Sequence, residues 1–189
     1  SFLEGRRFTE LLGAGMATSF IVSSGIVKAT GRASHAGGDH EKGINAILIA
    51  AKAIATLDLG RLDAETTCNL GVIKGGDAIN IVPKKVQVDG EVRSHDDNKL
   101  AQVTQRMIDA FQAAATSYPN RGDGDLPYVT VEVHPDFKCT HIPDHHAVVR
   151  MAFKAAERLN RPLRLQVAGG GSDANVFFQQ GINTGVRSL

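Results

Sequence analysis

In two segments of the chain, valines alternate with polar residues, and this pattern constrains the fold more than any other. In residues 85–95 and again in residues 128–134, every second side chain points to the same side of an extended strand. The valines on that shared side are Val86, Val88 and Val92 in the first segment and Val129, Val131 and Val133 in the second. The pattern predicts an antiparallel sheet with one covered face and one open, polar face.

Two helices are predicted to cover the valine face. Residues 41–57 repeat apolar side chains at helical spacing, with Ile47 and Leu48 on the predicted apolar side. Residues 97–116 show the same periodicity over a longer stretch. Each segment therefore predicts an amphipathic helix that packs on the sheet.

Two further strands complete this part of the chain. They are predicted at residues 25–33 and 66–74, and the second places Cys68, Leu70 and Val72 on one face. The order strand, helix, strand, strand, helix, strand is that of a ferredoxin-like sandwich. We therefore expect a four-stranded antiparallel sheet with two helices on one face.

The pattern changes after residue 137. A helix is predicted at about 144–159 with Asp144 as its N-cap, a strand at 163–167 and a short helix at about 173–180. Strand, glycine turn and helix form an α/β unit, but a single strand cannot make a domain. We expect this part to belong to a larger α/β domain whose other strands lie elsewhere.

The predicted fold class is thus α/β (α+β), with three parts. Residues 1–24 are a remnant of the α/β domain or a linker, residues 25–137 are the sandwich, and residues 138–189 are a truncated part of the α/β domain.

Charge, apolar runs and cysteine count argue against several classes of function. The formal net charge of +1 gives no global reason to expect a nucleic-acid partner, although a local basic patch is compatible with it. No uninterrupted apolar run approaches the ~20 residues that span a bilayer, so no membrane partner is expected. Cys68 and Cys139 are too few for a four-thiolate zinc site. We expect a cytoplasmic protein.

Three side chains are candidates for chemistry. His35 lies in Gly-Arg-Ala-Ser-His-Ala-Gly, at the end of a strand, where an imidazole can donate to a developing negative charge. Asn80 follows two glycines in a predicted turn. Arg93, on the open sheet face, has a fork that fits a carboxylate. The simpler interpretations are a solvated loop histidine, a turn former and a solvated cross-strand ion pair.

Two other segments are weaker candidates. The glycine run that ends in Gly170, Gly171 and Ser172 precedes a helix and suits an anion, but no Lys-Ser/Thr follows it. Residues 141–146 contain three histidines, yet His145 and His146 would point about 100° apart on a helix. We expect no metal ligands in this chain.

Six motifs in fixed order carry a resemblance. They are GRASHAG, EKGINAI, DAETTCNLG, GGDAINIVP, GEVRS and GGGSDANVF, within residues 25–186. Together they resemble the di-zinc metallopeptidases that include peptidase T, carboxypeptidase G and succinyl-diaminopimelate desuccinylase, and they are most similar to the peptidase T-like branch.

The resemblance implies a zinc-bearing α/β catalytic domain with the sandwich inserted as a lid and dimerisation domain. It implies that His35 reaches the active site of the neighbouring subunit of a homodimer and polarises the scissile carbonyl, and that Asn80 also acts from the partner. It implies that Arg93 binds the terminal carboxylate of the substrate. Gly170, Gly171 and Ser172 would line the substrate pocket.

The family's zinc ligands and general-base glutamate precede the lid, and nothing in residues 1–24 matches them. Its last zinc-binding histidine lies beyond the end of this sequence. We therefore expect two zinc ions in the complete enzyme and none in this chain.

The predicted function is a zinc-dependent, peptidase T-like aminopeptidase that hydrolyses an amide bond in small peptides, present here as a fragment. The alternatives are a non-enzymatic dimerisation module, or a deacylase or desuccinylase of N-acyl amino acids.

Overall fold

A computed structural model of the 189-residue chain describes residues 13–14, 21–119, 125–137, 142–165, 173–182, 184 and 187–188. The chain divides into two compact units, of which one contains residues 22–136 and the other contains residues 1–21 and 137–189.

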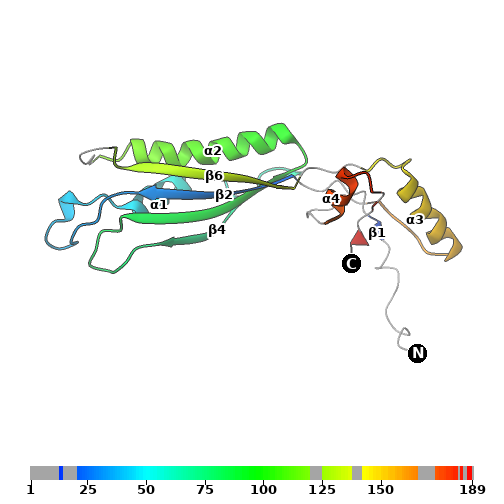
Figure 1. The fold of residues 1–189 in the computed structure, drawn as a ribbon, viewed down its shortest axis with the longest axis horizontal. Helices are drawn as coiled ribbons and strands as arrows, with labels where there is room; N and C mark the ends of the chain where they lie inside the picture. Colours follow the sequence, from blue (N-terminus) through cyan, green and yellow to red (C-terminus); the bar gives the residue numbers. More distant parts are fainter. Residues whose placement is uncertain are drawn as a thin grey trace, which may run out of the picture. The chain divides into compact units, whose positions relative to one another are not determined.

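The larger unit is a mixed sheet-and-helix sandwich, which confirms the predicted fold class (Figure 1). Its antiparallel sheet has the strand order β3-β4-β5-β2-β6. The strands are β2 (Ile21–Thr30), β3 (Gly60–Arg61), β4 (Thr66–Gly75), β5 (Lys85–Ser94) and β6 (Tyr128–Phe137). Four of them match the predicted strands, and the fifth, β3, is a two-residue addition at the edge.

The alternation in β5 sets the two faces of this sheet. Val86, Val88 and Val92 are almost completely buried under the helices, whereas Gln87, Asp89, Glu91 and Arg93 lie on the open face. In β4 the predicted alternation fails at Val72, because a β-bulge between Leu70 and Val72 shifts the register. A bulge inserts one extra residue and turns the following side chains to the other face. Val72 therefore lies beside Asp89 on the open side rather than in the core.

Helix α1 (Ala46–Ala55) is shorter than predicted and buries a different side. It follows a 3-10 turn, η2 (His40–Lys42), and begins where the Asn45 side chain accepts a hydrogen bond from Leu48 N. Its buried residues are Ala46, Ile49, Ala50 and Ala53. The prediction for Ile47 and Leu48 was wrong, since both are exposed. Alanines allow α1 to approach the sheet and its neighbouring helix closely, and the larger side chains face outward.

Helix α2 (Asp97–Thr116) has the predicted bounds. Asp96 caps it by accepting hydrogen bonds from Asn98 N at 2.7 Å and Lys99 N at 3.2 Å. Its Phe111 is completely buried in the core formed by α1, α2, β2 and β5. Replacing such a side chain by alanine typically costs about 3–5 kcal/mol, so α2 is a main source of the sandwich's stability.

The second unit contains α3 (Ala147–Arg158), α4 (Asp173–Gln179) and a two-stranded pair. In that pair, β1 (Gly13–Ala14) runs antiparallel to β7 (Arg187–Ser188), so the first and last described segments meet. The N-cap of α3 is His146 rather than the predicted Asp144, because the imidazole Nδ1 accepts a hydrogen bond from Val148 N.

Candidate functional site

The loops that carry His35 and Asn80 lie side by side at one end of the sheet. Ala36 N donates to Asn80 O at 2.9 Å, and Val82 N donates to Ser34 O at 2.9 Å. These bonds make His35 and Ile81 an antiparallel bridge. The structure thus brings together two candidate residues that are 45 positions apart in the sequence.

The His35 ring is held in one orientation by its own loop. Its Nδ1 accepts hydrogen bonds from Gly37 N at 3.1 Å and Gly38 N at 3.0 Å. An imidazole nitrogen that accepts carries no hydrogen, so the neutral ring has its hydrogen on Nε2. The residue is exposed. His35 therefore presents a pre-oriented Nε2–H donor on the outside of its loop.

The base of the His35 loop is closed by tight backbone packing. Arg32 and Ile44 exchange both backbone hydrogen bonds, at 3.0 and 2.9 Å. Gly31 lies so close that a Cβ there would be 2.0 Å from Ile44 O. Only glycine fits this position without movement of the backbone, which ties the loop to the start of α1.

Asn80 is exposed in the turn between β4 and β5. The turn follows Gly76, whose φ of +85° lies in the left-handed region that favours glycine. Among the described contacts, Asn80 uses its backbone oxygen to join the His35 loop, and its side-chain amide faces solvent.

Arg93 lies on the open face of β5, near its end. Its Nε donates to Glu91 Oε1 at 2.9 Å and its Nη2 donates to Glu91 Oε2 at 3.0 Å. This fork is a two-point carboxylate contact within one strand, rather than the cross-strand pair considered from the sequence. Glu91 is a residue that sequence reasoning left unassigned, although positions i and i+2 of a strand always share a face.

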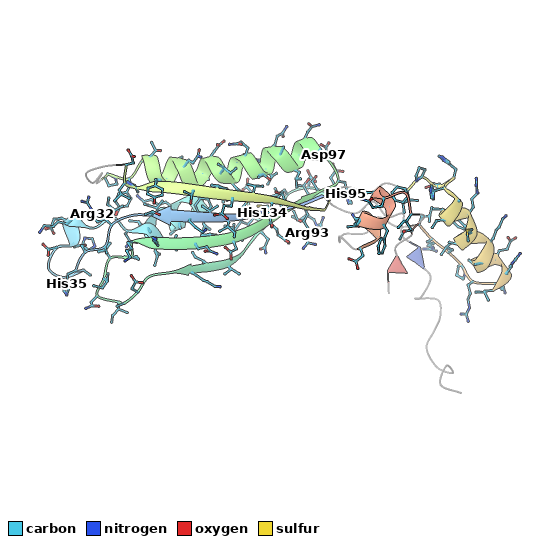
Figure 2. All side chains as sticks on the ribbon, viewed as in Figure 1. Arg32, His35, Arg93, His95, Asp97 and His134 are labelled. Carbon is cyan, nitrogen blue, oxygen red and sulfur yellow. The ribbon has the colours of Figure 1, made fainter. Side chains whose placement is uncertain are left out.

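The sheet keeps Arg93 far from His35 and Asn80. Eight residues of β5 separate Lys85, at the His35 end, from Arg93, and at ~3.3 Å per residue they span about 26 Å. Figure 2 shows His35 and Arg93 at opposite ends of the sandwich. One copy of the sandwich therefore holds two separate groups of candidate residues, which we call candidate half-sites, rather than one site.

The edge of the sheet beside these half-sites is only partly paired. β3 covers β4 only at Thr67 and Cys68, so on the side away from β5 the backbone of residues 69–75 pairs with no strand of the described part of the chain. Apolar side chains are exposed along this edge and on the adjoining helix. They are Ile73 on β4 and Ile47 and Leu48 on α1, while Val72, also exposed, lies on the opposite, open face. We call Ile73, Ile47 and Leu48 the edge patch.

The ionisation of two groups away from the half-sites is shifted. Burial raises the pKa of the Cys68 thiol, whose Sγ lies 3.4 Å from Met107 Sδ. The hydrogen bond from Glu65 N, followed by contact with Lys99, lowers the pKa of Asp63. Cys68 is thus a protonated core residue, and Asp63 is an ionised surface residue.

No metal site is present in the described part of the chain, where no three His, Cys, Asp or Glu side chains form a suitable group. Gly170, Gly171 and Ser172 lie outside the described residues, as does His141. In the same described part, no helix is long and apolar enough to cross a membrane.

Comparison with known proteins identifies the family. Residues 19–119, more than half of the chain, match the M20 peptidase dimerisation domain. The chain belongs to this family. The M20 dimerisation domain covers most of the sandwich, with its β4 edge and the loops of His35 and Asn80.

Relatives of this M20 chain extend beyond that domain. An uncharacterised Bacillus subtilis protein, YqjE, is 44% identical over 155 residues, which are 82% of this chain and 40% of that protein. The structure of aminopeptidase PepT from Bacillus cereus is 36% identical with a TM-score of 0.78, covering 92% of this chain and 45% of that one. A Staphylococcus aureus tripeptidase is 31% identical with a TM-score of 0.79, covering 90% and 44%. The chain spans less than half the length of each.

Proposed function

We propose that this chain contains the lid of a peptidase T-like aminopeptidase that acts on small peptides, and that two lids complete one another's sites. The observation that carries the proposal is the separation of the two half-sites by about 26 Å. A fully extended tripeptide spans only about 10 Å, so it cannot contact His35 and Arg93 of the same lid. The similarity to an aminopeptidase and a tripeptidase supports the substrate class.

Pairing of two β4 edges would bring the half-sites together. A two-fold axis beside an edge strand pairs that strand with its own copy in antiparallel fashion. Thr67 lies opposite Arg93 at one end of β4, and Gly75 leads toward Asn80 at the other end. Antiparallel pairing therefore places the Asn80 end of one subunit beside the Arg93 end of its partner.

The edge patch supports this choice of edge. An unpaired strand edge is a template for a second strand, and exposed apolar side chains beside it favour burial. Ile73 on β4 is 54% exposed. The Ile47 side chain of α1 lies close to Gly76, just after β4, since a Cβ at Gly76 would be 3.6 Å from Ile47 Cδ1. The end of β4 and α1 therefore form one continuous surface.

In the composite site, each residue has a defined role. The Nε2–H of His35 from one subunit donates to the carbonyl oxygen of the scissile amide as negative charge develops on it. The Arg93 guanidinium of the other subunit binds the terminal carboxylate and fixes the register of the peptide. Asn80 adds an amide beside His35. The two zinc ions implied by the family have no set of ligands among the described residues, and we derive no step through them.

The dimer is tested by sedimentation of the full chain at micromolar concentration. We expect a dimer, and we expect Ile73→Asp to weaken it at least tenfold, because the substitution puts two charges at the seam. Ile182→Asp is a matched control, since Ile182 is also 54% exposed but lies in the other unit. A monomeric wild-type chain, or equal effects of both substitutions, would contradict the proposed seam.

Activity is tested in the longer enzyme that we propose carries this lid. We expect cleavage of unmodified di- and tripeptides, and slower turnover of N-acetyl and N-succinyl amino acids. The reverse preference would point to the deacylase alternative, and no cleavage of either class by the metal-loaded protein would point to a dimerisation module. A cytoplasmic location is part of the proposal.

A further inference from the structure

A second, positively charged feature lies on the open face of the sheet. Three lysines from three neighbouring strands, Lys28, Lys74 and Lys85, line a hollow of about 620 Å³. Three residues that carry hydroxyl groups, Thr30, Thr130 and Tyr128, line the same hollow. The open face is free of helices, so the hollow is accessible from that side (Figure 1).

The strand register explains why these lysines converge. Lys74 lies directly opposite Gln87, and Lys85 is two residues from Gln87 on the same face of β5. The hydrogen bond from Gly31 N to Lys84 O, at 2.8 Å, aligns β2 with β5 and brings Lys28 to the other side of Gln87. Since adjacent strands are ~4.8 Å apart, the Cα atoms of Lys28 and Lys74 lie about 10 Å apart.

The charges in the hollow are not balanced by its own residues. Lys28 Nζ contacts Glu132 Oε1 at 3.0 Å. No ion pair to Lys74 or Lys85 is found among the described residues, and both side chains are exposed. Asp77 is the single acidic residue that lines the hollow. Like charges on neighbouring strands repel, so an anion in the hollow would relieve this repulsion.

We propose that this hollow binds the phosphate group of a small phosphorylated molecule. A phosphate monoester carries a charge of about −1.5 to −2 at neutral pH, which matches the two ammonium groups of Lys74 and Lys85 better than a single carboxylate does. Lysine binds phosphate as a point charge, and the neighbouring hydroxyls of Thr30 and Thr130 supply further donors. Nothing in this site depends on the proposed peptidase activity.

The size of the hollow indicates that the ligand has an organic part. Small-molecule sites usually enclose ~300–1,000 Å³, far more than one phosphate group occupies. Tyr128, which is 44% exposed, offers an aromatic surface at this site for that part.

Inorganic pyrophosphate is the probe for a direct test on the full chain. We expect saturable binding by calorimetry at constant ionic strength, with NMR shifts at the amides of Thr30, Lys85 and Gln87. The variant Lys74→Ala/Lys85→Ala should weaken binding at least tenfold. The variant Lys52→Ala/Lys154→Ala removes the same charge from exposed positions outside the hollow and should change the affinity less than twofold.

Citrate in a parallel titration separates phosphate from carboxylate recognition, and we expect it to bind at least tenfold more weakly than pyrophosphate. Circular dichroism confirms that both double variants are folded. The proposal is overturned by non-saturable binding, by equal losses in the two double variants, by shifts confined to the surroundings of Arg93, or by citrate binding as tightly as pyrophosphate.

Discussion

The proposed composite site predicts that two variants with impaired activity restore activity when they are mixed in one dimer. The variants are His35→Ala and Arg93→Ala, each made in the longer enzyme that we propose contains this chain. In a heterodimer, the subunit with His35→Ala still supplies Arg93, and its partner still supplies His35. One of the two sites is therefore complete, and the other lacks both residues.

The expected loss of activity in each variant follows from the typical cost of removing the contact that its side chain makes. Removing an oxyanion donor typically costs ~2.7–4 kcal/mol, so His35→Ala alone should retain about 1% of the activity or less. A hydrogen bond to a charged group contributes ~1.5–3 kcal/mol, so Arg93→Ala should retain at most about 10%. Random exchange makes half of the dimers mixed, each with one of two sites intact, so the mixture should recover about one quarter of wild-type activity.

The assay is hydrolysis of a free-acid tripeptide after subunit exchange, with heterodimers counted by native mass spectrometry of differently tagged subunits. Two tagged preparations of the same variant, exchanged in the same way, should show no gain. If verified heterodimers stay as inactive as the separate variants, His35 and Arg93 do not serve one site from two subunits.

Three further outcomes follow from named contacts. Arg93→Ala should lose activity on free-acid peptides and almost none on amidated ones, as compared by kcat/KM; equal losses would rule out carboxylate recognition. Gly31→Ala should lower the free energy of unfolding by at least about 2 kcal/mol in a urea titration, because its Cβ would lie 2.0 Å from a backbone oxygen. The pKa of Asp63 is lowered from its usual 3.8, first by the hydrogen bond from Glu65 N and then by Lys99, so its stabilisation is present above that pH and is lost as the pH falls through the folded-state value. Asp63→Asn should flatten the fall in the free energy of unfolding with decreasing pH. An unchanged fall would show that the contacts of Asp63 with Glu65 N and Lys99 do not contribute to this pH dependence.

Local pattern was sufficient for most of the lid. Val86, Val88 and Val92 could be assigned to the covered face because side chains in a strand alternate without exception until a bulge intervenes. The bounds of α2 followed from its periodicity, and the structure adds that the Asp96 carboxylate caps its first turn. Both inferences depend only on residues close in the sequence, and both were confirmed.

The predictions that failed were those that depended on tertiary packing and strand pairing. The periodicity of α1 is compatible with burial of Ile47 and Leu48 or of Ile49 and Ala53, and only the distance to the sheet and α2 decided for the smaller residues. The bulge that exposes Val72 is defined by the pairing of β4 with β5, which no single strand encodes.

For the candidate site too, the sequence identified residues and the tertiary structure determined how they are arranged. The sequence by itself identified His35 and Arg93 as chemically suitable residues from their side chains and neighbours, and the resemblance of the ordered motifs added a role for Asn80. Their arrangement was decided only by the tertiary structure. Backbone hydrogen bonds between distant loops join His35 to Asn80, and the length of a rigid β-strand holds Arg93 at the opposite end of the sheet.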